Sequence, residues 1–195
     1  MTSRLSVVAV AALVLGIGAA NCTMAAEPAT TTYGERNPQA PAELDLFSFL
    51  VGTWNVTGKT RQEDGKYVDW DGATWIGRYV LDGMAIADEL HASTPDGKPG
   101  LGITLRQFDA KRGSWIIEFL NVTYSFLRRQ VNPRSGSVSR DGETIVVISE
   151  DAETRIRENY RVLDRNHVTY TTELSRDAGR TWGPILVEMT MTRVD

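Results

Sequence analysis

Cysteine and histidine are almost missing from this chain of 195 residues, which contains one cysteine and two histidines. Cys22 has no second cysteine to pair with, so the stability of the fold must come from its core rather than from a disulfide. His91 and His167 are too few for a three-histidine zinc site, and no H-x-H or H-E-x-x-H spacing occurs. The sequence therefore predicts neither a disulfide scaffold nor a metal site.

Excess positive charge is also lacking. The chain has 21 basic and 25 acidic residues, a formal net charge of −4, and no basic run. Binding to a phosphate backbone requires clustered lysine and arginine, so we expect no nucleic-acid partner. G-x-S-x-G, a glycine-rich phosphate loop and a dinucleotide fingerprint are all absent, so the usual support for a hydrolase or a nucleotide enzyme is missing.

Only one long apolar run occurs, over residues 5–20. Arg4 precedes the run and Ala25-Ala26 follow it, and this order of charged, apolar and small residues is typical of a secretory signal peptide. The run is too short for a stable membrane anchor, so no membrane span is expected. Cys22 follows Asn21, a poor neighbour for lipidation. We expect residues 1–26 to be cleaved and the mature protein to be periplasmic or secreted.

Residues 27–41 contain three of the seven prolines and no periodic apolar pattern, which predicts an extended tether. The domain is expected over residues 42–195. It opens with a short helix, because Leu44, Phe47 and Leu50 follow at helical spacing after Pro41.

After Gly52 the apolar period changes to two, which indicates strands to the end of the chain. Turn residues such as Asp64-Gly65 and Asp141-Gly142 divide this part into about ten short strands. The predicted strands cover about residues 53–62, 67–80, 84–92, 101–108, 114–121, 124–131, 144–150, 154–163, 167–174 and 184–193.

Short turns without crossover helices favour an all-β, antiparallel up-and-down β-barrel, with a two-sheet sandwich as the alternative. Alternation predicts which side chains point inward. In the strand over 101–108 the apolar residues Leu101, Ile103 and Leu105 are expected inside, while Thr104 and Arg106 are expected to face water.

Gly52-x-Trp54 after a short helix, with Arg193 ending the last strand, resembles the opening and closing signature of the calycin barrels, which include the lipocalins. Residues 75–87, 105–115 and 175–182 extend this resemblance to an uncharacterised family of exported bacterial calycin-like domains, over about residues 44–195. The resemblance implies a ligand-holding barrel, similar to lipocalins, fatty-acid-binding proteins and haem-binding nitrobindins, in which Arg193 lies against the ring of Trp54.

Residues 175–182 also match the S-x-D-x-G-x-x-W pattern of the sialidase "Asp box". A single copy predicts a stabilised turn, not a propeller. The residues of this turn motif are Ser175, Asp177, Gly179 and Trp182.

Two carboxylates fall on faces expected to point into the barrel: Asp88, which shares a face with Ile86 and Leu90, and Glu158, which shares a face with Tyr160. A buried carboxylate needs a partner or a wet cavity, since burying it unpaired costs several kcal/mol. An arginine such as Arg128 or Arg78 could form such a pair without any ligand. The cavity candidates are Asp88, Glu158, Tyr160, Tyr79, Asn121, Arg128 and Tyr170.

These patterns support three functional hypotheses. The first is a module that binds a small apolar or amphipathic molecule, with Trp70 at the barrel entrance as a further contact. The second is an isomerase, hydratase or cyclase that uses a buried carboxylate beside a tyrosine hydroxyl. The third is an exported interaction protein without a ligand. No cofactor is expected; a haem held by His91 or His167, as in nitrobindins, is a further alternative, although both histidines are expected at exposed turns.

Overall fold

The computed structural model describes residues 31–93, 99–122, 126–131, 137–151 and 154–194. Within this part of the chain, one short 3-10 helix precedes eleven strands. The elements are η1 (Ala42–Leu50), β1 (Gly52–Arg61), β2 (Tyr67–Val80), β3 (Ala85–Ser93), β4 (Pro99–Asp109), β5 (Ser114–Asn121), β6 (Phe126–Val131), β7 (Ser137–Asp141), β8 (Thr144–Asp151), β9 (Thr154–Val162), β10 (His167–Ser175) and β11 (Ile185–Arg193).

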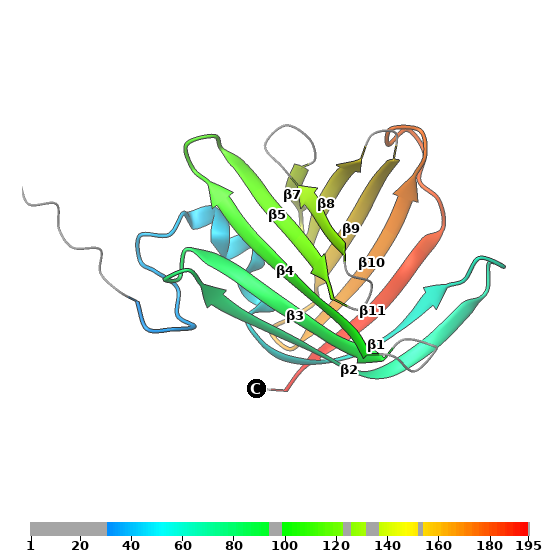
Figure 1. Ribbon diagram of the computed structural model, residues 1–195, viewed down its shortest axis with the longest axis horizontal. Helices are drawn as coiled ribbons and strands as arrows, with labels where there is room; N and C mark the ends of the chain where they lie inside the picture. Colours follow the sequence, from blue (N-terminus) through cyan, green and yellow to red (C-terminus); the bar gives the residue numbers. More distant parts are fainter. Residues whose placement is uncertain (1–30, 94–98, 123–125, 132–136, 152–153, 195) are drawn as a thin grey trace, which may run out of the picture.

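The strands form one antiparallel sheet in the order β6-β5-β4-β3-β2-β1-β11-β10-β9-β8-β7. The sheet curls on itself so that β6 comes near β8, which gives a nearly closed barrel (Figure 1). Every neighbouring pair is consecutive in sequence except β1 and β11, where the two ends of the domain meet. The predicted up-and-down barrel is therefore confirmed.

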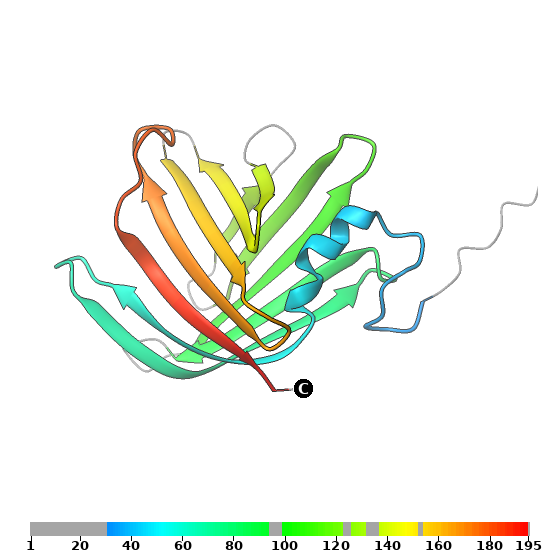
Figure 2. The same ribbon diagram turned by 180° about the vertical axis from the view of Figure 1, so that it is seen from behind.

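One end of the barrel is closed by η1, which lies between the walls in Figure 2. Leu44, Phe47 and Leu50 of this helix are fully buried. Phe47 packs edge-on against Trp115 of β5, with ring centroids 4.9 Å apart. The apolar face of the helix thus fills one end of the barrel.

Trp54 and Arg193 meet beside η1, as the calycin resemblance implies. The guanidinium carbon of Arg193 lies 4.1 Å from the centroid of the fully buried Trp54 ring. Arg193 also donates hydrogen bonds to the carbonyl oxygens of Phe49 at 3.0 Å and Val51 at 2.8 Å. Gly52, with a φ of 122°, makes the tight passage from helix to strand that a side chain would strain.

The turn motif has the structural role predicted for it. Asp177 accepts hydrogen bonds from the Thr181 amide at 2.9 Å and the Thr181 hydroxyl at 2.7 Å. The hydroxyl of Ser175 accepts one from the amide of Gly179 at 2.8 Å. The Arg157 guanidinium covers the Trp182 ring, with its carbon 4.3 Å from the ring centroid.

The inside–outside assignment of β4 was wrong. Arg106 is buried with 2% exposure and Thr104 is buried as well, whereas Leu105 is 36% exposed. Arg106 pairs with Ile117 of β5, whose side chain is in the core, so both residues share the inner face. Alternation alone failed because this strand presents its leucines outward and its polar residues inward.

Two further features differ from the sequence expectation. β7 lies in none of the predicted strands, yet it pairs with β8 along its whole length. The end of the segment expected to be a tether is held against the barrel: the amide of Asn37 donates to the carbonyl of Gly83 at 3.2 Å, and its side chain donates to the carbonyl of Asp82 at 3.0 Å. Residues 1–30, including the expected signal peptide and Cys22, lie outside the described residues.

Candidate functional site

A cavity of about 240 Å³ lies inside the barrel. Its apolar side chains come from β2, β3, β5, β9 and β11, and its polar side chains come from β3, β4, β9 and β10. The lining residues are Trp75, Asp88, Leu90, Gly102, Thr104, Phe119, Ile156, Glu158, Tyr160, Tyr170, Thr172 and Met189. Four of the sequence candidates, Asp88, Glu158, Tyr160 and Tyr170, are thereby brought to one place.

Gly102 of β4 shapes one wall of this cavity. A Cβ at this position would come within 2.7 and 2.9 Å of two ring atoms of Phe119, which pack directly over it. The absence of a side chain at Gly102 thus leaves room for the Phe119 ring to pack against the backbone of β4.

Asp88 and Arg106 form an ion pair at the inner end of the cavity, with both side chains almost completely buried. The guanidinium of Arg106 also donates to the hydroxyl of Tyr160 at 3.2 Å, and it lies 5.1 Å from the centroid of the Phe47 ring. A charge removed from water needs this kind of compensation, because an unpaired buried ion costs several kcal/mol. The pair therefore makes two buried charges tolerable beside an apolar space.

Glu158 and Tyr170 form the second polar contact of the cavity. The Tyr170 hydroxyl donates to the Glu158 carboxylate at 2.8 Å. Burial, followed by the nearby Glu158 charge, raises the pKa of Tyr170 and also that of Tyr160 well above the ordinary value. Both phenols are thus neutral at physiological pH: the Tyr170 hydroxyl donates a hydrogen bond to Glu158, and the Tyr160 hydroxyl accepts one from Arg106.

The remaining cavity candidates lie elsewhere or outside the described side chains. Tyr79 is buried in the core near the N-terminal segment, where Gly34 bridges to it, and does not line the cavity. Burial raises the pKa of the Tyr79 hydroxyl. Asn121 pairs with Gly102 at the inner face of β5 but is not among the lining residues. Arg128 pairs with Phe119 in the ladder, and its side chain lies outside the described part.

Sequence reasoning missed Arg106, and it also missed Thr104 and Thr172, which line the cavity. The expected partners of the inward carboxylates were Arg128 and Arg78, but Arg78 instead forms an ion pair with Glu89 on the outer surface. The signal that could have found Arg106 is the pairing with β5: once Ile117 is placed inside, the antiparallel partner at position 106 must also point inward.

A family model described as "Protein of unknown function (DUF1579)" matches residues 39–193, nearly the whole described domain. The chain belongs to this family. A search of the curated proteins finds no match for this DUF1579 member.

Among solved structures, the DUF1579 chain is similar to Rv2717c from M. tuberculosis, with 13% identity, a TM-score of 0.50, and coverage of 80% of this chain and 99% of that one. It is also similar to the S-type phycobiliprotein lyase CPES from Guillardia theta, with 12% identity, a TM-score of 0.49, and coverage of 77% and 92%. A de novo designed fluorescence-activating β-barrel has 13% identity, a TM-score of 0.39, and coverage of 76% and 97%. At these identities, the likeness to Rv2717c shows the barrel fold alone.

The two histidines of this DUF1579 chain lie at the outer surface. His91 is 3.1 Å from Glu89, and His167 is 2.9 Å from Asp164. Neither lines the cavity. Across the described residues, no group of three or more His, Cys, Asp or Glu side chains could hold a metal ion, and no helix is long and apolar enough to cross a membrane.

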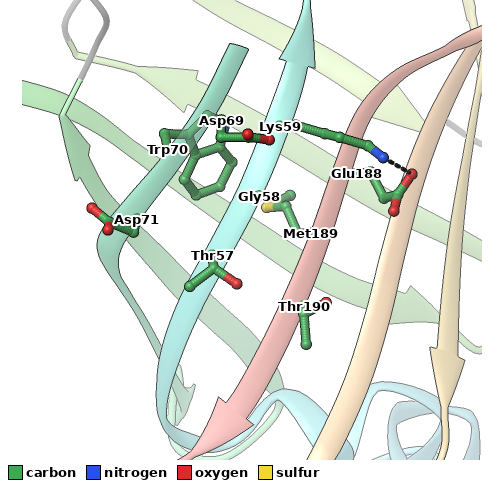
Figure 3. Close-up of a pocket in the computed structure, with 9 residues that line it drawn as sticks. All are labelled: Thr57, Gly58, Lys59, Asp69, Trp70, Asp71, Glu188, Met189 and Thr190. Atoms are coloured by element: carbon green, nitrogen blue, oxygen red, sulfur yellow. Dashed lines mark ion pairs between the residues drawn. The ribbon is translucent and has the colours of Figure 1, made fainter. Parts of the chain in front are cut away.

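A wider groove of about 460 Å³ lies where β1, β2 and β11 run side by side (Figure 3). Its Lys59 is paired with Glu188 at 3.2 Å. Trp70, expected at the entrance, is half-buried over Gly58 and donates its indole N–H to the Thr60 hydroxyl at 3.0 Å. The smaller cavity within the barrel is the better candidate for a ligand site, because the apolar and polar side chains of opposite walls converge on it.

Proposed function

We propose that this barrel binds one small, largely apolar molecule that carries a polar group, and that it does so in the periplasm or outside the cell. The observation that carries the proposal is the cavity of about 240 Å³ with Asp88 at 2% and Glu158 at 6% exposure in its wall. Apolar walls with a few convergent polar groups are typical of small-molecule sites.

The size of the cavity limits the ligand. Pockets for drug-sized molecules usually measure about 300–1,000 Å³, so a cavity slightly below this range favours a compact molecule of one or two rings or a short chain. The location rests on the expected signal peptide over residues 1–26.

Native mass spectrometry of the protein purified from expressing cells tests this proposal. The wild type is expected to retain a small-molecule adduct. Thr172→Phe, which places a ring in the cavity, is expected to lose the adduct. Thr192→Phe, on the exposed outer face of β11, is the matched control and is expected to keep it. A wild type that carries no adduct and binds no apolar probe would overturn the proposal.

The Glu158–Tyr170 contact favours a second candidate, an isomerase, hydratase or cyclase acting in the same cavity. The Glu158 carboxylate can take a proton from a bound molecule, and the Tyr170 hydroxyl, which donates to this carboxylate at 2.8 Å, holds it in position.

Glu158→Gln separates this candidate from simple binding. The variant keeps the shape of the site but removes the base, so a catalyst would accumulate substrate and the variant would retain a molecule different from the one in the wild type. Identical adducts in both proteins would contradict catalysis and leave the binding proposal standing.

A further inference from the structure

The indole N–H of Trp75 is a buried donor that has no acceptor within the described part of the chain. Trp75 is 5% exposed and lines the barrel cavity. Other tryptophans behave differently: Trp54 donates to the carbonyl of Leu50 at 3.2 Å, and Trp70 donates to Thr60 at 3.0 Å. Buried polar groups are nearly always hydrogen-bonded, so an exception in a cavity wall requires an explanation.

The surroundings of Trp75 indicate where an acceptor would come from. Trp75 stands opposite Trp54 on β1 and Leu90 on β3, and neither of these side chains offers an oxygen. The Tyr170 ring is 6.5 Å away, and its hydroxyl is already directed to Glu158. Trp75 is also one of the residues that line the cavity, so a molecule bound there lies beside its side chain and can supply the acceptor.

We propose that the Trp75 N–H donates a hydrogen bond to a neutral carbonyl oxygen of the molecule in the cavity. This inference rests on the proposed binding function and specifies the polar group of its ligand. The acceptor is neutral because the residues that line the cavity include no cation, and the nearby Arg106 is already paired with Asp88, so a ligand carboxylate would be buried without a counter-ion. The apolar part of the ligand then lies against Phe119, Ile156 and Met189.

A matched pair of probes tests this contact. Acetophenone and ethylbenzene have nearly the same shape, but only the ketone has an acceptor. Calorimetric titration gives their affinities for the wild type, Trp75→Phe, and the control Trp182→Phe, which changes a tryptophan at the turn outside the cavity. The ratio of ketone affinity to hydrocarbon affinity is expected to fall about tenfold in Trp75→Phe, the equivalent of one hydrogen bond, and to stay unchanged in Trp182→Phe. Benzoate is expected to bind less tightly than acetophenone.

A second measurement uses the unmodified protein, in case Trp75→Phe does not fold. In ¹⁵N-labelled wild type, the indole proton resonance of Trp75 is expected to move downfield with acetophenone but not with ethylbenzene. If both probes bind and this resonance responds alike, or the affinity ratio is the same in all proteins, the Trp75 contact is refuted while the binding function stands. Tighter binding of benzoate than of acetophenone refutes the neutral acceptor. If neither probe binds the wild type, the binding function itself fails.

Discussion

At the scale of single residues, the ion pair of Asp88 with Arg106 is the costliest feature of the interior. Both side chains are almost completely excluded from water, and Arg106 gains further contacts with Tyr160 and Phe47. Replacing such a pair with apolar residues is often neutral, whereas removing one member leaves an uncompensated charge. The pair is therefore expected to fix which groups face the cavity more than to add net stability.

A double-mutant cycle checks this expectation. Asp88→Leu and Arg106→Leu should each destabilise the protein by about 3–5 kcal/mol, because each leaves the partner's charge buried without a counter-ion. The double variant should lose clearly less than the sum of the two. Urea unfolding measures all four proteins, and additive losses would show that the two side chains do not depend on each other.

The Trp54–Arg193 contact gives a second prediction at this scale. Trp54→Ala should cost about 3–5 kcal/mol as a large-to-small change in a fully buried position. Arg193→Lys should cost less, because lysine keeps the charge near the ring but loses the paired bonds to the carbonyls of Phe49 and Val51. Urea unfolding measures the free energy of unfolding of both variants. If Arg193→Lys is as unstable as Trp54→Ala, the prediction that the lysine variant loses less stability is wrong.

Residue-level prediction from the sequence succeeded where the apolar pattern was regular. Asp88, Glu158, Tyr160 and Tyr170 lie on the same strand faces as core residues, and they line the cavity. Arg106 could not be placed this way, because leucine and isoleucine occupy the outward positions of β4 and reverse its pattern. Its location depends on the partner strand and on Asp88, which is information that a single strand does not contain.

At the scale of elements, the β10–β11 connection is stabilised by its own hydrogen bonds. The hydroxyl and then the amide of Thr181, with further help from Ser175, lower the pKa of Asp177 far below its ordinary value of 3.8. A carboxyl whose folded-state pKa is depressed contributes stability above its unfolded pKa, and this contribution disappears as the pH falls through the folded-state value.

The lowered pKa of Asp177 therefore predicts how the stability of the protein depends on pH. The difference in thermal stability between wild type and Asp177→Ala should be constant from about pH 7 to pH 5 and should shrink as the pH falls below about 4. Thermal unfolding followed by circular dichroism across this range measures it. A difference that grows on acidification would show that the ionised carboxylate does not hold this turn.

Most elements could be predicted because turn residues mark the ends of nearly every strand. β7 escaped prediction because only Val138 of its five residues packs against the core. The anchoring of Asn37 at the β2–β3 turn could not be foreseen either, since its bonds go to backbone groups more than forty residues away.

At the scale of the whole molecule, the fold is a nearly closed barrel with one sealed end and a partly filled interior. The helix and Trp54 occupy the sealed end, the buried ion pair lies next to it, and the cavity extends beyond. Because β1 pairs with β11, the ends of the domain close the barrel together, so that damage at this seam should affect the cavity as well as stability.

The measurement that tests most directly whether this cavity holds a small molecule is methyl NMR of methionine-labelled protein titrated with acetophenone. Met189 lines the cavity, whereas Met191 is buried two residues further along the same face and Met84 precedes β3; neither is among the lining residues. A saturable shift of the Met189 methyl resonance, with Met191 and Met84 nearly unchanged, is the predicted result. No saturable shift, or a shift confined to Met84, would contradict a ligand site inside the barrel.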